Sequence, residues 1–141
     1  MTARDLGEAL AGMTWSLEPG EFELLGFADA PLPEDLALLE RGPAQVIREG
    51  GETTLLVRSE DAGEVRTRHA DARSEGPLAW VRFEAPMGWE VVGFLARVTG
   101  ALASAGVPLG AVCGFSRDHL FVHVKYLAAA EGVLEGLFPR R

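Results

Sequence analysis

The stretch "GAVCGFSRDHLFVHV", residues 110–124, contains the clearest indication of the fold. Its two apolar runs, 110–115 and 120–124, are short and rich in β-branched and aromatic residues, which is typical of strands. The polar residues between them, Ser116 to His119, suit a turn. The stretch therefore predicts a hairpin, and the polar side chains of its turn are candidates for a functional site.

The segments on either side of this hairpin predict helices. Along residues 90–106, apolar side chains recur at spacings of three and four, and Gly106 and Pro108 end the pattern. The side chains that mark this helix are Val91, Leu95, Val98, Leu102 and Ala105. A second amphipathic helix is expected at 126–138 and a strand at 78–84. The second half therefore reads strand, helix, strand, turn, strand, helix.

The first half predicts the same order of elements. The expected elements are a short helix at 2–12 capped by Thr2, a strand at 21–28, a helix at 32–42 and a hairpin at 44–59 around "GGE". The acids Glu34 and Asp35 are expected to be solvated at the start of their helix. Residues 59–76 are polar, and a helix capped by Ser59 is expected to run into an exposed connection.

A constant shift superimposes the two halves. Leu120 lies 65 residues after Leu55, and the same shift places Val57 on Val122. Internal duplication of this kind constrains the whole fold, because both copies must adopt one arrangement. The repeat therefore indicates that the chain contains two copies of a single structural unit.

These patterns predict an α+β protein of two ferredoxin-like βαββα units, residues 1–76 with an N-terminal extension and residues 77–141. Each unit lacks one closing strand, so exchange of a strand between the units is an open alternative. The segment "TWSL", residues 14–17, is a candidate for one missing strand.

The composition excludes several classes of partner. The chain has 141 residues, is 48% hydrophobic and carries a formal net charge of −8, which disfavours nucleic acid and anionic membrane surfaces. It contains no apolar run of about 18 residues and no secretory signal at its N-terminus. Cys113 is the only cysteine and cannot form an internal disulfide. These features predict a cytoplasmic location.

The polar residues of the hairpin could bind a metal ion, form a catalytic Cys–His pair or contact a ligand. His119 and His123 lie about 13 Å apart on a strand, too far for one metal ion to bridge, so no metal site is expected. Cys113 and His119 could approach across the hairpin, but no third group orients them, and an inert buried cysteine is the more usual case. Asp118 either bonds its own turn or faces a ligand.

At this point the sequence resembles the tandem ACT-like family of small bacterial proteins, relatives of the regulatory ACT pairs of aspartate kinases and of CASTOR-type amino-acid sensors. The likeness runs from about Leu17 to Leu137. It rests on "LEPGEFELLGFAD" (17–29), "AQVIREGGETTLLV" (44–57), "LAWVRFE" (78–84) and "AGVPLGAVCGFSRDHLFVHV" (105–124). The family shows an acidic-glycine-threonine run at the first hairpin, here residues 49–53, and an Asp-His pair that opens the last strand, here Asp118 and His119.

The resemblance implies a regulatory protein, not an enzyme, that binds a small amino acid or a similar metabolite at the interface of the two units, without a cofactor. A loop that leads into a helix presents free backbone N–H groups and a positive dipole end to a carboxylate, and Gly88 lets that backbone come close. Asp118 is expected to accept hydrogen bonds from the ammonium group of the ligand. The predicted ligand contacts are Pro86, Met87, Gly88, Trp89, Cys113, Gly114 and Asp118.

One part of the chain departs from the family pattern. The family carries a serine-rich stretch where residues 86–89 read Pro-Met-Gly-Trp, although the following Val92-Gly93 pair matches. Because no catalytic domain is expected, an effector protein would be separate, and exposed strand edges favour a homodimer. Two other classes stay open: a protein-interaction module without a ligand, and a small enzyme that would depend on Asp118, His119 or Cys113.

Overall fold

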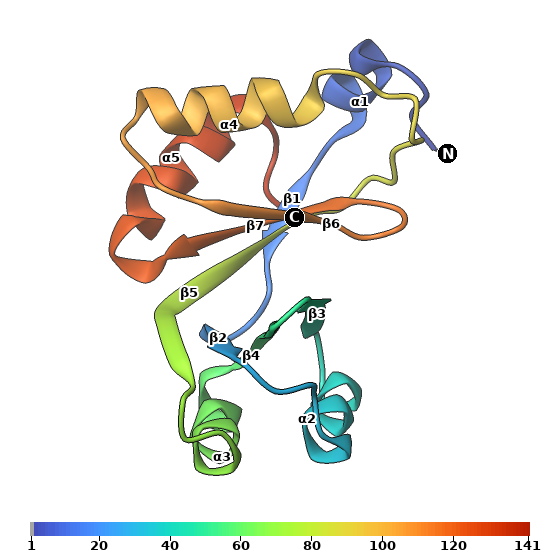
Figure 1. The fold of residues 1–141 in the computed structure, drawn as a ribbon. Helices are drawn as coiled ribbons and strands as arrows, with labels where there is room; N and C mark the ends of the chain where they lie inside the picture. The colour runs from blue at the N-terminus through green and yellow to red at the C-terminus, as the bar shows by residue number, and fades with distance from the viewer. Residues whose placement is uncertain (1) are drawn as a thin grey trace. The chain divides into compact units, whose positions relative to one another are not determined.

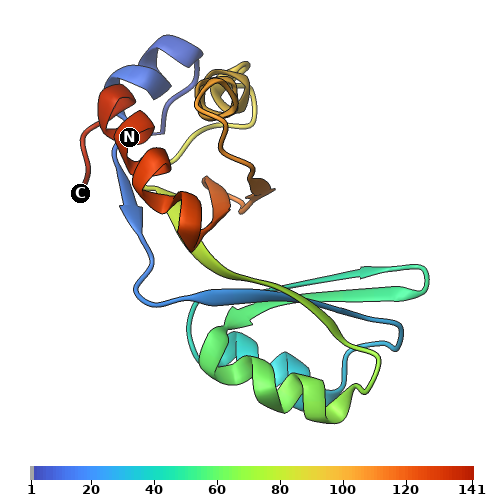
Figure 2. The ribbon, with the colours of Figure 1, turned by 90° about the vertical axis from the view of Figure 1, so that its left-hand side faces the viewer.

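The computed structural model describes residues 2–141 and divides the chain into two compact units (Figures 1 and 2). Unit 2 is the continuous segment Pro19–Leu78. Unit 1 combines the described residues up to Glu18 with Ala79–Arg141. The sequence placed the boundary after residue 76 and assigned the whole N-terminal segment to the first unit. The structure differs for this segment, because its apolar side chains pack in the core of unit 1.

Unit 2 is a complete ferredoxin-like unit with the strand order β3-β4-β2-β5, in which each neighbouring pair is antiparallel. Its elements are β2 (Phe22–Phe27), α2 (Pro33–Ala37), the 3-10 turn η1 (Leu38–Glu40), β3 (Gln45–Glu49), β4 (Glu52–Arg58), α3 (Ser59–Arg68) and the first half of β5 (Arg73–Phe83). Both helices cover one face of the strands (Figure 1). The core between them contains Leu25, Phe27, Leu38, Leu55, Val57, Ala62 and Val65.

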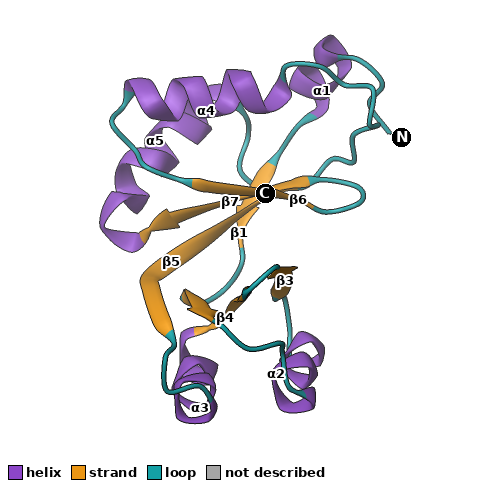
Figure 3. Cartoon of the chain, in the orientation of Figure 1, coloured by secondary structure: helices purple, strands orange, loops and turns teal. Residues whose placement is uncertain are grey.

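Unit 1 repeats this arrangement with one substitution of strands. Its elements are α1 (Leu6–Gly12), β1 (Trp15–Leu17), the second half of β5, α4 (Phe94–Ser104), β6 (Gly110–Cys113), β7 (Asp118–His123), the 3-10 turn η2 (Val124–Tyr126) and α5 (Leu127–Leu137). β5 pairs with β1 and with β7, and β6 follows β7. Figure 3 shows α4 lying along one side of these strands. The antiparallel strand β1 takes the edge position that β5 takes in unit 2. The prediction of two ferredoxin-like units is confirmed, with "TWSL" as the source of a missing strand.

The N-terminal segment is anchored in unit 1 through Trp15. Its side chain is fully buried, and its Nε1–H donates to the Phe138 carbonyl at 3.2 Å. The Arg140 guanidinium lies 4.9 Å from the Trp15 ring centroid and contacts the Glu131 carboxylate at 2.6 Å. Trp15 thus joins the two ends of the chain within one unit.

The polar segment after β4 is less exposed than its sequence predicts. Asp35 and His69 are both buried, and the Asp35 carboxylate accepts from His69 Nε2 at 2.7 Å and from Arg68 Nη2 at 2.6 Å. His69 also stacks on Phe27 with ring centroids 3.6 Å apart. The prediction of a solvated Asp35 is therefore wrong. The expected exposed connection is short, because β5 begins already at Arg73, although residues 70, 71 and 73–75 are exposed as predicted.

Candidate functional site

The loop between β5 and α4, residues 84–93, is tied to two other segments of unit 1 by its backbone. Met87 N–H donates to the Ser116 carbonyl at 2.9 Å, and Gly88 N–H donates to the Ala3 carbonyl at 2.8 Å. Ala3 N–H in turn donates to the Pro86 carbonyl at 3.1 Å. The expectation that Met87 and Gly88 present free N–H groups to a ligand is therefore wrong, because both donate within the protein.

The first turn of α4 provides the free backbone donors instead. Gly93 has a φ of 97°, a left-handed conformation that glycine adopts readily, and the helix begins at the next residue. The first intrahelical donor is Arg97 N–H, which bonds the Gly93 carbonyl at 3.0 Å. The N–H groups of Phe94, Leu95 and Ala96 precede it and have no acceptor within the helix. Glycine has no side chain to cap them.

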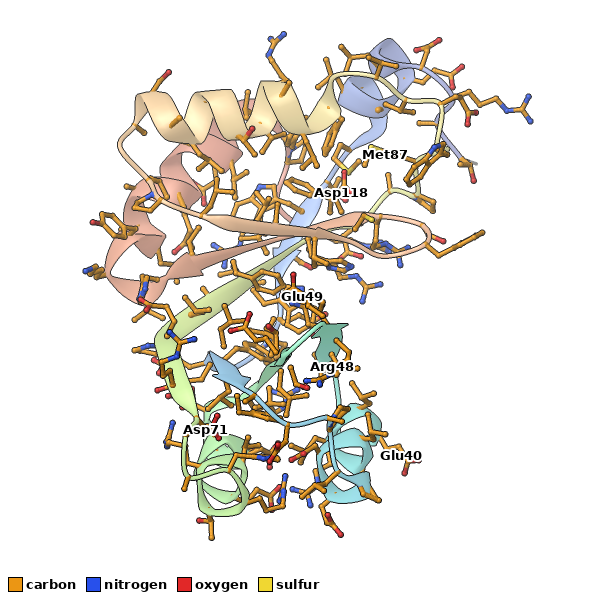
Figure 4. The ribbon with its side chains drawn as sticks, in the orientation of Figure 1. Glu40, Arg48, Glu49, Asp71, Met87 and Asp118 are labelled. Carbon is orange, nitrogen blue, oxygen red and sulfur yellow. The ribbon has the colours of Figure 1, made fainter. Side chains whose placement is uncertain are left out.

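A cavity of about 390 Å³ lies between this loop, the first turn of α4 and the turn that joins β6 to β7. Figure 4 labels Met87 and Asp118, which both line it below the start of α4. The lining residues are Met87, Gly88, Trp89, Val91, Gly93, Phe94, Leu95, Ala96, Cys113, Gly114, Phe115, Ser116, Arg117 and Asp118. An adjoining hollow of about 650 Å³ shares much of this lining and adds Thr2 and Pro86.

The structure thus brings all seven sequence-predicted site residues to one region of unit 1. Six of them line the smaller cavity, and Pro86 lines the adjoining hollow. The sequence did not identify the first turn of α4 or Phe115 as part of the site. The signal was present in Gly93, which separates Val91 from the helix to which its apolar spacing assigned it.

Asp118 is the acid of this cavity. It is the first residue of β7, pairs in register with Cys113 and is half-buried. Burial raises the pKa of its carboxyl group above the ordinary value of 3.8. Within residues 2–141, no side chain donates a hydrogen bond to this carboxylate. A cationic group in the cavity would therefore satisfy an acid that the protein leaves partly desolvated.

His119 lies on the opposite side of β7 and does not belong to the cavity lining. Trp80 Nε1–H donates to His119 Nδ1 at 3.0 Å, so this nitrogen carries no proton. Burial, with the nearby charges of Arg82 and Arg117, lowers the pKa of His119 below 6.5. The Asp-His pair of the sequence is therefore divided between two environments, an acid at the cavity and a neutral imidazole beside Trp80.

Three large apolar side chains on the β5–α4 loop and the β6–β7 turn are exposed. Trp89 is 94% exposed, Val92 80% and Phe115 107% of the reference value. Trp89 and Phe115 line the cavity from its two sides, the β5–α4 loop and the β6–β7 turn. Exposed aromatic groups beside an apolar hollow are typical of binding surfaces.

The corresponding position in unit 2 is filled by the protein itself. The register pair Arg48 and Thr53 lies 65 residues before the pair Cys113 and Asp118. Arg48 Nη1 donates to the Ala28 carbonyl at 2.8 Å and to Thr53 Oγ1 at 3.0 Å. These bonds join the loop after β2 to the β3–β4 hairpin (Figure 4 labels Arg48).

The same loop has two further ties in unit 2. Thr53, which is fully buried, donates through Oγ1 to the Asp29 carbonyl at 2.6 Å. The Asp71 carboxylate accepts from Ala28 N–H at 2.9 Å. Side chains of unit 2 therefore close the place that is a cavity in unit 1.

Comparison with known proteins agrees with this geometry. Residues 73–136, from β5 into α5, match the model of the ACT domain family, and this segment contains the residues that line the cavity of about 390 Å³. The predicted resemblance to tandem ACT-like proteins is confirmed. Comparison with curated proteins gives no match.

Several solved structures share the fold of nearly the whole chain. A protein from Agrobacterium tumefaciens has a TM-score of 0.75 and 17% identity over 92% of both chains. A Vibrio cholerae protein of unknown function, described as a possible transport protein, has a TM-score of 0.68 and 23% identity over 91% of both chains. The regulatory subunit of aspartate kinase from Thermus thermophilus has a TM-score of 0.64 and 17% identity, over 88% of this chain and 97% of that one. At these identities the likeness establishes the fold alone.

Between residues 2 and 141, no three His, Cys, Asp or Glu side chains gather closely enough to hold a metal ion. No helix in the same range is both long and apolar enough to cross a membrane.

Proposed function

We propose that this protein is a regulatory protein that binds a small amino acid, or a metabolite with the same carboxylate and ammonium groups, in the cavity of unit 1. The observation that carries the proposal is that Asp118 and the first turn of α4 line one cavity. The ligand carboxylate would accept from the free N–H groups of this turn, where the helix dipole favours negative charge. The ligand ammonium would contact the partly desolvated Asp118.

Two findings support a regulatory role. The segment that contains the cavity matches the ACT domain model, and the structural relatives include a regulatory subunit of aspartate kinase. The sequence placed the ligand at the interface of the two units, whereas the present proposal rests on the cavity within unit 1.

A catalytic role has less support from the geometry. The base that the sequence suggested for Cys113 is His119, whose Nδ1 accepts a hydrogen bond from Trp80. We therefore propose no catalytic step. The ligand would instead stabilise one arrangement of the β5–α4 loop and the β6–β7 turn and shift a population that an effector protein reads. Homodimer formation and a cytoplasmic location stay predictions.

The first experiment is a thermal shift of the full chain against the twenty amino acids at millimolar concentration. A ligand present at 100 times its dissociation constant should stabilise the protein by about 2.7 kcal/mol. Asp118→Asn should abolish the shift. Glu135→Gln, the same change at an exposed position of α5, should preserve it.

The outcomes separate the alternatives. A complete absence of stabilisation across the panel would reject amino-acid binding and favour the interaction module, with the exposed Trp89 and Phe115 as its contact surface. A shift that survives Asp118→Asn would reject the assigned role of this acid.

A further inference from the structure

We infer that the ligand of the unit 1 cavity is an amino acid with an uncharged, apolar side chain. This inference rests on the proposed function and specifies its ligand class. It follows from the side chains that remain to contact the ligand once its carboxylate and ammonium groups are placed.

The walls of the cavity are predominantly apolar. The side chains concerned are Met87, Trp89, Val91, Phe94, Leu95 and Phe115. They come from the loop, the helix start and the hairpin turn, so apolar atoms surround the space on each of these sides. An apolar side chain in this space would remove both its own surface and theirs from water, which stabilises the complex in proportion to the area buried.

The described lining offers no second acid to a positive charge. Asp118 is the only acid among its described residues, and the ligand ammonium occupies that carboxylate. Glu90 belongs to the loop and its carboxylate lies beside Gly88, but Glu90 is exposed to solvent and is not one of the lining residues. A lysine or arginine side chain would therefore enter apolar surroundings without a counter-charge, which is strongly unfavourable.

A second negative charge would have one cation to meet. Among the described residues of the lining, Arg117 is the only cation, and its Nη2 donates to the Glu84 carbonyl at 3.3 Å. Its Nε is buried without a hydrogen-bond partner. A ligand aspartate or glutamate side chain would have to bury its carboxylate at this one group among apolar walls, where the cost of desolvation offsets the attraction.

The exposed rings at the cavity mouth have a function under this inference. Trp89 and Phe115 lie on the two segments that the Met87 N–H bond to Ser116 joins at 2.9 Å. An apolar ligand side chain between them would give both rings a contact that water does not provide. A charged ligand would leave the rings without this contact.

The test is isothermal titration calorimetry of the full chain with single amino acids. The apolar set is leucine, isoleucine, valine, methionine and phenylalanine, and the charged set is aspartate, glutamate, lysine and arginine. We expect dissociation constants at least about tenfold lower for the best apolar ligand than for every charged one.

A substitution of Trp89 at the opening of the cavity should reduce the preference for apolar over charged amino acids. Trp89→Glu adds an acid beside the ligand side chain, and because Trp89 is 94% exposed the core is untouched. It should weaken binding of the apolar ligand and strengthen binding of lysine or arginine. Trp89→Leu, which keeps the position apolar, should retain the order of preference.

The failure of this inference differs from the failure of the proposed function. Tighter binding of a charged amino acid, lost in Asp118→Asn, would overturn the apolar specificity and leave the amino-acid site intact. An unchanged preference in Trp89→Glu would also overturn it. If none of the nine amino acids binds, the apolar specificity is rejected, and the site itself is rejected only if the thermal shift against all twenty amino acids is also negative.

Discussion

At the scale of single residues, Asp35 shows how a buried charge is made tolerable. Burial alone would raise the pKa of its carboxyl group, but hydrogen bonds from Leu32 N–H, His69 and Arg68 outweigh this effect and lower it below 3.8. Two of these donors, His69 and Arg68, connect α2 to the end of α3. The acid is therefore a structural element of unit 2 and not a solvated helix start.

Asp35→Asn should destabilise the protein by about 3 kcal/mol, because the amide cannot accept from all of these donors and leaves Arg68 partly unpaired. Urea unfolding at neutral pH measures the loss. Glu34→Gln, a change at the exposed neighbour, should have little effect. Because the folded pKa of Asp35 is lowered, its contribution is present above pH 3.8 and is lost as the pH falls through the folded value. An equal loss in both variants would reject this account.

Asp118 should make ligand binding depend on pH, because its carboxyl group becomes protonated at a higher pH than an ordinary aspartate. Burial raises its pKa above 3.8, and protonation removes the charge that contacts the ligand ammonium. Affinity should therefore fall as the pH drops through this raised value, and Asp118→Asn should bind weakly with no such dependence. Calorimetric titrations between about pH 4 and 7 test this.

Without ligand, the raised pKa of Asp118 has a different consequence. The folded state then holds the proton more tightly than the unfolded state, so this group alone makes the fold less stable as the pH rises through the interval. If the ligand affinity measured by calorimetry stays constant while Asp118 becomes protonated, Asp118 does not contact the ligand ammonium.

Sequence patterns located the acids of both units but not their surroundings. Asp118 was identified because it opens a strand after a turn, which is a local pattern. The burial of Asp35 depends on Arg68 and His69, which lie more than thirty positions further along the chain. No local pattern contains that contact, so a solvated helix start was the natural prediction.

At the scale of elements, the β6–β7 hairpin was predictable and the start of α4 was not. Short apolar runs around a polar turn define a hairpin by themselves. The start of α4 depends on the positive φ of Gly93 and on the bond from Gly88 N–H to Ala3, a segment distant in sequence. Apolar spacing extended the helix to residue 90, although the loop continues to Gly93.

The closed hairpin of unit 2 suggests a direct way to block the site in unit 1. Cys113→Arg places an arginine where Arg48 stands in unit 2, opposite Asp118 instead of Thr53. Its guanidinium should pair with Asp118 and abolish ligand binding while the fold persists, because Cys113 is exposed. Cys113→Ser should bind normally, and calorimetry with circular dichroism distinguishes blocking from unfolding.

The comparison of the two units also predicts the number of ligand-binding sites per chain. Because Arg48 and Thr53 occupy the equivalent place in unit 2, the native chain should bind one ligand and not two. A measured stoichiometry of two per chain would contradict this assignment, as would full binding by Cys113→Arg.

At the scale of the whole molecule, the sequence predicts the duplication, but it predicts only in part which segment supplies each strand of each unit. The apolar spacing of the repeat predicts two units. β1 has only three residues and no periodic pattern, and its pairing of Trp15 with Phe83 joins distant parts of the chain. The N-terminal segment was consequently assigned to the unit that follows it in sequence.

Trp15→Ala should destabilise unit 1 selectively. Removal of a fully buried indole leaves a cavity and the loss is expected to be about 3–5 kcal/mol. Hydrogen exchange should show the loss of protection in α4 and in the β6–β7 hairpin, whereas β3 and β4 of unit 2 should keep theirs. A uniform loss across both units would contradict the assignment of residues 2–18 to unit 1.

The shared strand β5 also determines the order in which the two units can fold during synthesis on the ribosome. Unit 2 is continuous and can fold once residue 78 has emerged, because the first half of β5 completes its sheet. The first eighteen residues, although made earlier, must wait for residues 79–83 before β1 has a partner. A nascent chain would therefore carry Trp15 and Met13 exposed beside a finished unit, as a defined target for chaperones until the last strands of unit 1 are made.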